Sequence, residues 1–168
     1  MRTLAIFVFA AATMAAQSNP LVSASKASYA GVKDNVLRSA EKVPEDLYSF
    51  KPTPEVRTFG QLIAHEADGQ YEMCGPAAAK PVTKDVEKTV TGKTALIGAL
   101  KEAFAYCDAV YATMTDKDAA TMVTMFGGKT TKLNAMYANI AHTDEHYGNL
   151  VTYMRLKGIV PPSSEPKK

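Results

Sequence analysis

Residues 138–158, ANIAHTDEHYGNLVTYMRLKG, form an uninterrupted helical pattern that carries two histidines, His142 and His146. On a helix with about 3.6 residues per turn, a four-residue spacing places the two side chains on one face, about 40° apart. Two imidazoles placed in this way can hold one divalent metal ion, but such a site needs a further ligand. His65 is the only other histidine in the chain. The interpretation of this stretch therefore depends on whether the fold brings His65 to the same face.

Apolar residues recur at three- and four-residue intervals in four segments, which predicts four helices around one core. We expect these helices at residues 19–42, 58–74 and 93–114, and from the glycine pair at 127–128 to Gly158. Thr58 and Gln61 have the spacing of a capping box at the start of the second helix. No segment alternates between apolar and polar residues as a half-buried strand would. The sequence therefore predicts an all-α four-helix bundle.

The connection between the second and third helices is long for a helical bundle, in which antiparallel neighbours are usually joined by about two to eight residues. About fifteen residues of mixed character separate these two helices, and a crossover between parallel helices would explain that length. Residues 116–128 are expected to form a second connection with a short helical turn.

The composition is that of one globular domain, with 46% hydrophobic and 21% charged residues among 168. The formal net charge is only +2, and there is no internal block of lysines and arginines. We therefore expect no nucleic-acid partner.

Residues 1–16 have the pattern of a secretory signal peptide: a positive start, an apolar run at residues 4–12 and small residues before Gln17. The alternative is an uncleaved anchor, although the run is short for spanning a membrane. We expect the signal to be removed and the protein to be exported, periplasmic or secreted, from a bacterial cell. The mature chain would then consist of a bundle at residues 17–160 and a flexible tail at residues 161–168, with no membrane association.

Two cysteines, Cys74 and Cys107, would meet an oxidising compartment after export, so they could pair. Both lie on the apolar faces of their helices, where a free cysteine behaves as a small hydrophobic residue. A core of this size does not need a covalent link, which favours two free thiols.

Two glutamates are candidates for a catalytic or ligand-orienting role beside the histidines. Glu66 falls within the apolar arc of the second helix, where a carboxylate is costly unless it meets a cation, a metal or good donors. It could act as a base or orient a ligand, and Glu145 could do the same from beside His146. The competing interpretation is that both glutamates are structural or solvated charges, and that the histidines only form local hydrogen bonds. Zn²⁺, Ni²⁺ and Fe²⁺ all suit imidazole ligands, and nothing in the sequence selects among them.

Two further sequence patterns resemble known motifs but lack residues that those motifs require. The Gly-Lys-Thr sequences at residues 92–94 and 128–130 lack the further glycine that a phosphate loop requires. Thr143 stands where a zincin helix has its glutamate.

Three stretches resemble the DinB/YfiT-like superfamily of metal-dependent four-helix proteins: LYSFKPTPEVRTFGQLIAH (47–65), KTALIGALKEAFAYCD (93–108) and AHTDEHYGNLVTYMRLKGIVPPSS (141–164). The resemblance implies an up-down-down-up bundle. It also implies a metal held by His65, His142 and His146, all of which are present. Parallel second and third helices would place Cys74 and Cys107 at similar heights along the bundle, so a disulfide between them is possible.

The function that the resemblance implies is less specific. Similar proteins include thiol-dependent S-transferases and a thiol-dependent isomerase, but their thiol cofactors are cytoplasmic, whereas this chain is expected to be exported. One hypothesis is a metal-dependent hydrolase or transferase that acts on a small-molecule substrate. The other is a non-catalytic metal-binding or stress-related protein. A homodimer is compatible with either.

Overall fold

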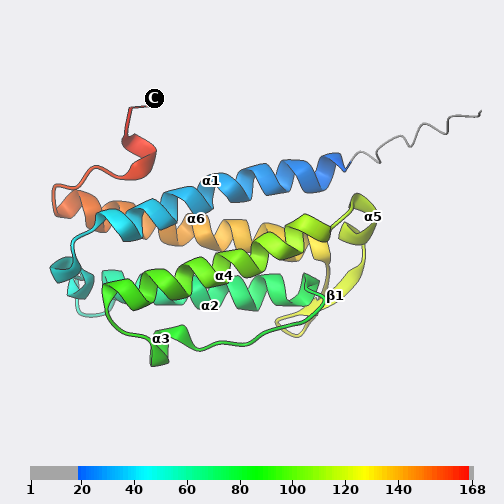
Figure 1. Ribbon diagram of the computed structural model, residues 1–168, viewed down its shortest axis with the longest axis horizontal. Helices are drawn as coiled ribbons and strands as arrows, with labels where there is room; N and C mark the ends of the chain where they lie inside the picture. Colours follow the sequence, from blue (N-terminus) through cyan, green and yellow to red (C-terminus); the bar gives the residue numbers. More distant parts are fainter. Residues whose placement is uncertain (1–18, 167–168) are drawn as a thin grey trace, which may run out of the picture.

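The computed structural model describes residues 19–166, and four long helices form its core (Figure 1). They are α1 (Pro20–Lys42), α2 (Phe59–Cys74), α4 (Lys93–Thr113) and α6 (Lys132–Leu156). The predicted capping box is present at the start of α2, where Thr58 and Gln61 each accept a hydrogen bond from the other's backbone amide. Within the described range, no helix combines the length and apolar character that crossing a membrane would require.

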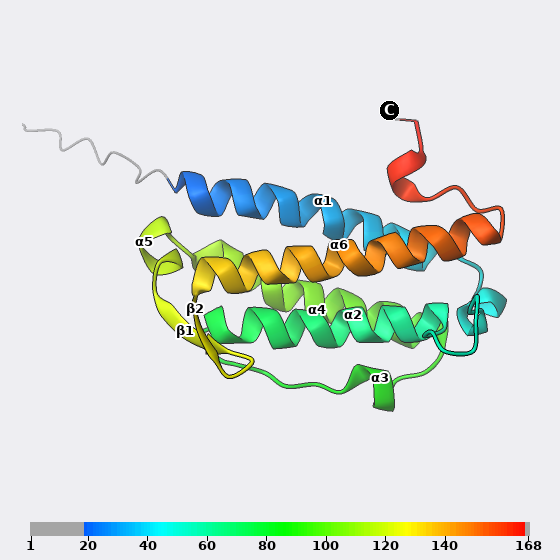
Figure 2. The ribbon, with the colours of Figure 1, turned by 180° about the vertical axis from the view of Figure 1, so that it is seen from behind.

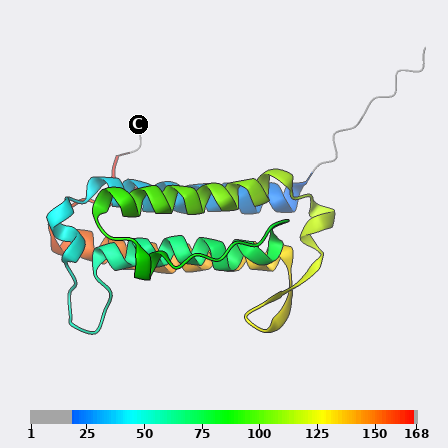
Figure 3. The ribbon, with the colours of Figure 1, turned by 60° about the horizontal axis from the view of Figure 1, so that its bottom comes forward.

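The helices lie side by side in two pairs (Figures 1 and 2). Helices α2 and α4 run in the same direction, and α1 and α6 run in the opposite direction. The connection between α2 and α4 therefore returns along the length of the bundle, as Figure 3 shows. It contains the 3₁₀ turn η2 (Gly75–Ala77) and the short helix α3 (Val86–Thr89). A second 3₁₀ turn, η1 (Glu45–Ser49), lies between α1 and α2.

Aromatic and aliphatic side chains from all four long helices fill the space between them. Tyr29 illustrates how polar groups are accommodated there, because its ring is only 2% exposed and its hydroxyl donates to the carbonyl oxygen of Phe104, 3.0 Å away. Burial raises the pKa of the Tyr29 hydroxyl well above its usual value, so it remains a hydrogen-bond donor.

The expectation of a chain without strands is wrong in one place. After the short helix α5 (Asp116–Ala119), strands β1 (Met122–Met125) and β2 (Gly128–Thr131) pair as an antiparallel hairpin. Phe126 and Gly127 form its turn, both with positive φ. The hairpin lies at the edge of the bundle and its residues are exposed or half-buried, so they carry no strong apolar alternation that could have revealed a strand.

The expectation of two free thiols is also wrong, because Cys74 and Cys107 form a disulfide. Their Cα atoms lie 5.6 Å apart, within the usual range for this bond. Parallel α2 and α4 place the two cysteines at the same height, and both side chains are fully buried. The covalent link thus joins two helices inside the core.

The described part of the C-terminal tail is packed against the bundle. Residues 161–166 contain the 3₁₀ turn η3 (Pro162–Ser164), and the Tyr147 hydroxyl donates to Ser163 Oγ at 2.7 Å. Glu165 forms ion pairs with Arg38 and Lys42 of α1. These contacts attach the tail to α1 and α6.

The predicted signal peptide, residues 1–16, lies outside the described residues.

Candidate metal centre

The structure brings the three histidines together between α2 and α6. One ligand nitrogen from each of His65, His142 and His146 lies within 4.8 Å of the other two. The Nε2 atoms of His65 and His142 are 3.2 Å apart, and the three ring centroids are separated by 4.4 to 5.1 Å. Among the described residues, these are the histidine, cysteine or acidic side chains that could together hold a metal ion.

Each histidine also has a polar neighbour at its Nδ1 atom, on the outer side of the cluster. His65 Nδ1 lies 3.4 Å from Glu87 Oε2, and His142 Nδ1 lies 3.4 Å from Glu66 Oε1. His146 Nδ1 lies 3.3 Å from the side-chain amide of Asn149. Carboxylates beside Nδ1 of His65 and His142 favour a proton on that atom, which leaves the lone pair of these two rings on Nε2, the arrangement that metal-binding histidines use. The group beside His146 is the amide nitrogen of Asn149, a donor, so this contact does not place a proton on His146 Nδ1.

Glu87 reaches His65 because α2 holds the short helix α3 against its side. The carboxylate of Asp68, three residues after His65, accepts hydrogen bonds from the backbone amides of Val86 and Glu87 at 2.6 and 2.9 Å. Arg57 then donates to Glu87 Oε1 at 2.8 Å. Partial burial would raise the pKa of Glu87, but the hydrogen bonds and charge of Arg57 outweigh it and lower this pKa below its usual value. Glu87 is therefore an ionised partner for His65.

The electrostatics of the cluster favour neutral imidazoles. Burial, reinforced by the neighbouring His146 and His65, lowers the pKa of His142 to about 4. Burial is also the main reason why the pKa of His146 lies below its usual value. A histidine must be neutral to bind a metal ion, so these two are ready to act as ligands near neutral pH.

The two candidate glutamates occupy different positions. Glu66 is completely buried, and its carboxylate lies behind the His142 ring, on the Nδ1 side and away from Nε2. Burial raises the pKa of Glu66 to about 8, although the Thr143 hydroxyl acts in the opposite direction. Glu145 is exposed on α6 and influences His146 only through its charge. Neither carboxylate lies where the Nε2 atoms meet, which does not favour a role as general base.

Gly69 makes room for the His142 ring. A Cβ atom at this position would lie 2.5 Å from His142 Cε1 and 2.9 Å from Nδ1, closer than side chains can approach. Gly69 has an ordinary helical backbone, so the close approach of the ring, and not the backbone conformation, is what requires glycine here.

These residues fit a divalent metal ion in their chemistry. Nitrogen ligands of a tetrahedral zinc site, with bonds of about 2.0–2.1 Å, lie about 3.3 Å apart. The separation of 3.2 Å between the Nε2 atoms of His65 and His142 matches that value. Three neutral imidazoles leave at least one coordination position for water or substrate, and they suit zinc, nickel or iron.

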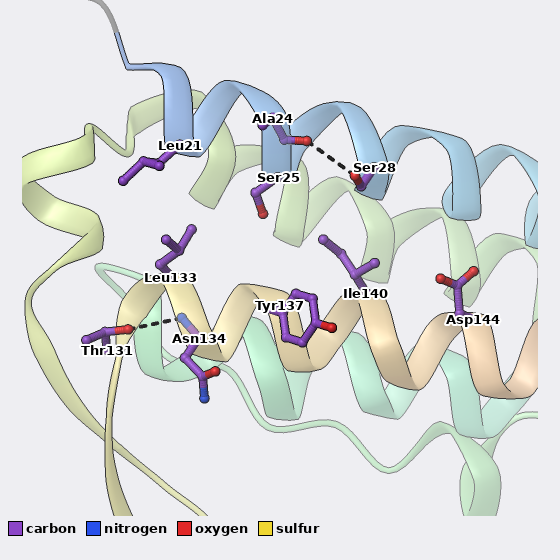
Figure 4. A pocket seen from close by; sticks show the side chains of 10 residues that line it. All are labelled: Leu21, Ala24, Ser25, Ser28, Thr131, Leu133, Asn134, Tyr137, Ile140 and Asp144. Carbon is purple, nitrogen blue, oxygen red and sulfur yellow. Dashed lines mark hydrogen bonds between the residues drawn. The ribbon is translucent and has the colours of Figure 1, made fainter.

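Two of the cavities that border α2 or α6 differ in character. One of about 670 Å³ borders His65 and is lined largely by charged side chains, including Arg57, Lys84 and Glu87. The other, of about 780 Å³, is a largely apolar groove between the N-terminal halves of α1 and α6 (Figure 4). Leu21 and Tyr137 face it from opposite sides, and no histidine lines it. The polar cavity is therefore the one associated with the histidine cluster.

Sequence reasoning missed three residues of the site: Arg57, Gly69 and Glu87. Arg57 and Glu87 lie in connections without periodicity, so only the tertiary fold brings them beside His65. Gly69 offered one available signal, because a glycine inside a helix one turn after a candidate ligand indicates a close approach.

The chain is thus a helical-bundle protein with a three-histidine cluster between two of its helices. The sequence pattern of the DinB superfamily matches residues 29–150, and the chain belongs to this superfamily. No curated protein sequence gives a significant match.

Solved structures agree with this fold. A DinB-like protein from Bacillus cereus is 18% identical with a TM-score of 0.74, and the match covers 83% of this chain and 95% of that one. The DinB-like protein YjoA from Bacillus subtilis is 22% identical with a TM-score of 0.67, over 89% and 100% of the two chains. A variant of a mycothiol-dependent maleylpyruvate isomerase is 12% identical with a TM-score of 0.66, over 77% of this chain and 60% of that one.

Proposed function

We propose that the chain is a metal-dependent enzyme, a hydrolase or transferase, whose divalent ion is held by His65, His142 and His146. The observation that carries the proposal is the convergence of three imidazoles whose Nδ1 atoms all face polar groups on the outside of the cluster. The Nε2 atoms of His65 and His142 face each other at 3.2 Å, and one ring nitrogen of each histidine lies within 4.8 Å of the other two. Lowering the pKa of a bound water or polarising a carbonyl is the chemistry that a divalent ion supplies in such a site.

The surroundings of the cluster leave room for a water or substrate beside the metal ion, which supports catalysis. No described side chain completes the histidine cluster as a fourth ligand. The polar cavity beside His65, which is lined by both basic and acidic side chains, could take a small polar substrate. Glu87 would hold His65 in place while Arg57 keeps Glu87 ionised.

The proposal that the enzyme is a transferase rests on a structural neighbour of low sequence identity. One structural neighbour is a mycothiol-dependent isomerase. At 12% identity this likeness concerns the fold, so a substrate thiol is one of the acceptors to be tested and carries no further weight.

A non-catalytic metal-binding protein is the second candidate. The observation in its favour is the position of the two glutamates, since Glu66 is buried behind His142 and Glu145 is exposed. Neither is placed to take a proton from a water at the inner side of the cluster.

We also propose that the protein acts after export, in the periplasm or outside the cell, once residues 1–16 have been removed. The disulfide between Cys74 and Cys107 supports this location, because such bonds persist in oxidising compartments and are rare in the cytosol.

The topology of the bundle is a separate proposal. The directions of the four long helices in Figure 1 support an up-down-down-up arrangement.

Turnover by the mature chain tests the enzymatic proposal. The protein would be loaded with zinc, nickel or iron and screened against esters, amides and thiol acceptors, with His142→Ala as the matched variant. We expect activity that the substitution reduces by two or more orders of magnitude. Equal activity in both proteins would refute metal-dependent catalysis at this site.

A further inference from the structure

We propose that Glu66 is a positioning residue that fixes the His142 ring for the metal, and that it is retained at a cost to the stability of the metal-free fold. The inference rests on the proposed metal site and adds a residue to it. Glu66 would accept the Nδ1 proton of His142, which leaves the Nε2 lone pair directed at the other two histidines.

Glu66 is buried where a carboxylate is costly to the stability of the fold. Its side chain is 0% exposed, and neither carboxylate oxygen has a hydrogen bond of ordinary geometry within the described part of the protein, although the Thr143 hydroxyl is near enough to act on its pKa. A buried carboxylate without a paired cation or well-formed hydrogen bonds destabilises a fold, because it loses the hydration that it has in the unfolded chain. Something other than the stability of the helix pair must therefore account for a glutamate here.

His142 supplies the matching group. Its Nδ1 atom is also buried without a hydrogen bond, and it faces Glu66 Oε1 at 3.4 Å. Gly69, on the same helix as Glu66, leaves the space in which this ring lies. Helix α2 thus provides both the recess for the ring and the acceptor for its proton, so a small shift of the ring would complete the hydrogen bond.

The buried side chain of Gln70, one turn from Glu66, is held by other groups. Gln70 donates to Thr143 Oγ1 at 3.1 Å and accepts from Asn139 at 2.9 Å, so Gln70 has partners other than Glu66. The other two histidines meet different outer groups: Glu87 is shared with Arg57, and Asn149 is neutral. Of the three outer groups, Glu66 is therefore the carboxylate without a cation of its own, and the charge that it would balance is that of a metal ion.

The test compares Glu66→Leu and Glu66→Gln with the wild-type mature chain. Zinc affinity would be measured by competition with a chelator, and the melting temperature would be measured on metal-free protein. We expect Glu66→Leu to weaken zinc binding by about 10- to 100-fold, the range typical of outer partners of metal ligands, without lowering the melting temperature of the metal-free protein. Glu66→Gln keeps an oxygen that can accept from Nδ1 and should recover part of the affinity.

Gln70→Leu is the matched control, because it removes a buried polar side chain one turn further along α2 that contacts no histidine. It should lower the melting temperature and leave zinc affinity unchanged. The inference is overturned if Glu66→Leu behaves like this control, or if its zinc affinity equals that of the wild type. If the wild-type chain itself binds no zinc, nickel or iron, the proposed metal site fails, and the inference fails with it.

Discussion

His142 occupies space that α2 leaves free only because residue 69 is glycine. A Cβ atom there would overlap the ring at 2.5 Å. Glycine inside a helix costs about 0.5–1 kcal/mol relative to alanine, and α2 accepts this cost at a position one turn after His65. The glycine is therefore best explained by the geometry of the histidine cluster.

Gly69→Ala is expected to displace the His142 ring and to weaken zinc binding by about tenfold or more, as loss of ligand orientation does. Gly98→Ala in α4 is the control, because a Cβ atom there meets nothing within 4 Å. The control should stabilise its helix by about 0.5–1 kcal/mol and keep zinc affinity. Chelator competition and thermal unfolding measure both effects. Unchanged zinc affinity in Gly69→Ala would show that the ring does not need this recess.

Single residues also show how far the sequence could predict the site. The spacing of His142 and His146 places both on one face of a helix, and the family resemblance adds His65, so the proximity of the three could be anticipated. The position of Glu87 could not. It depends on Asp68 binding the first turn of α3, a contact between segments that no local pattern encodes.

At the scale of elements, the four long helices follow their apolar periodicity closely, since each buries one face against the others. The hairpin of β1 and β2 escaped prediction because it packs at the edge and has little apolar patterning. The disulfide depended on the relative height of α2 and α4. Periodicity defines each helix separately and contains no information about that height.

The disulfide is expected to stabilise the bundle without shaping the histidine cluster, because it joins α2 to α4 while the histidines lie between α2 and α6. It closes a segment of 33 residues, for which chain-entropy arguments give about 4 kcal/mol. Replacing Cys74 and Cys107 together with alanine should lower the free energy of unfolding by roughly this amount.

Chemical denaturation measures that loss, and zinc affinity measured on the still-folded double variant should match the wild type. The same protein should show no further loss of stability when a reductant is added, whereas the wild type should. A wild-type protein that is indifferent to reductant would contradict a stabilising role for the bond.

For the whole molecule, the bundle provides a rigid frame in which two antiparallel helices present the three imidazoles. α2 contributes His65, Glu66 and Gly69 within about one turn, and α6 contributes His142 and His146 one turn apart. The long connection between α2 and α4 adds Glu87 from outside. The site is thus assembled from two core helices and one surface connection, and none of these segments could form it alone.

The central claim is that these three histidines bind one divalent metal ion. Elemental mass spectrometry of the purified mature protein, after loading and removal of excess metal, measures it directly. We predict one zinc, nickel or iron ion per chain in the wild type, and almost none when His65, His142 and His146 are all replaced by alanine in a protein that still folds. Stoichiometric metal in the triple variant would contradict the assignment of the site.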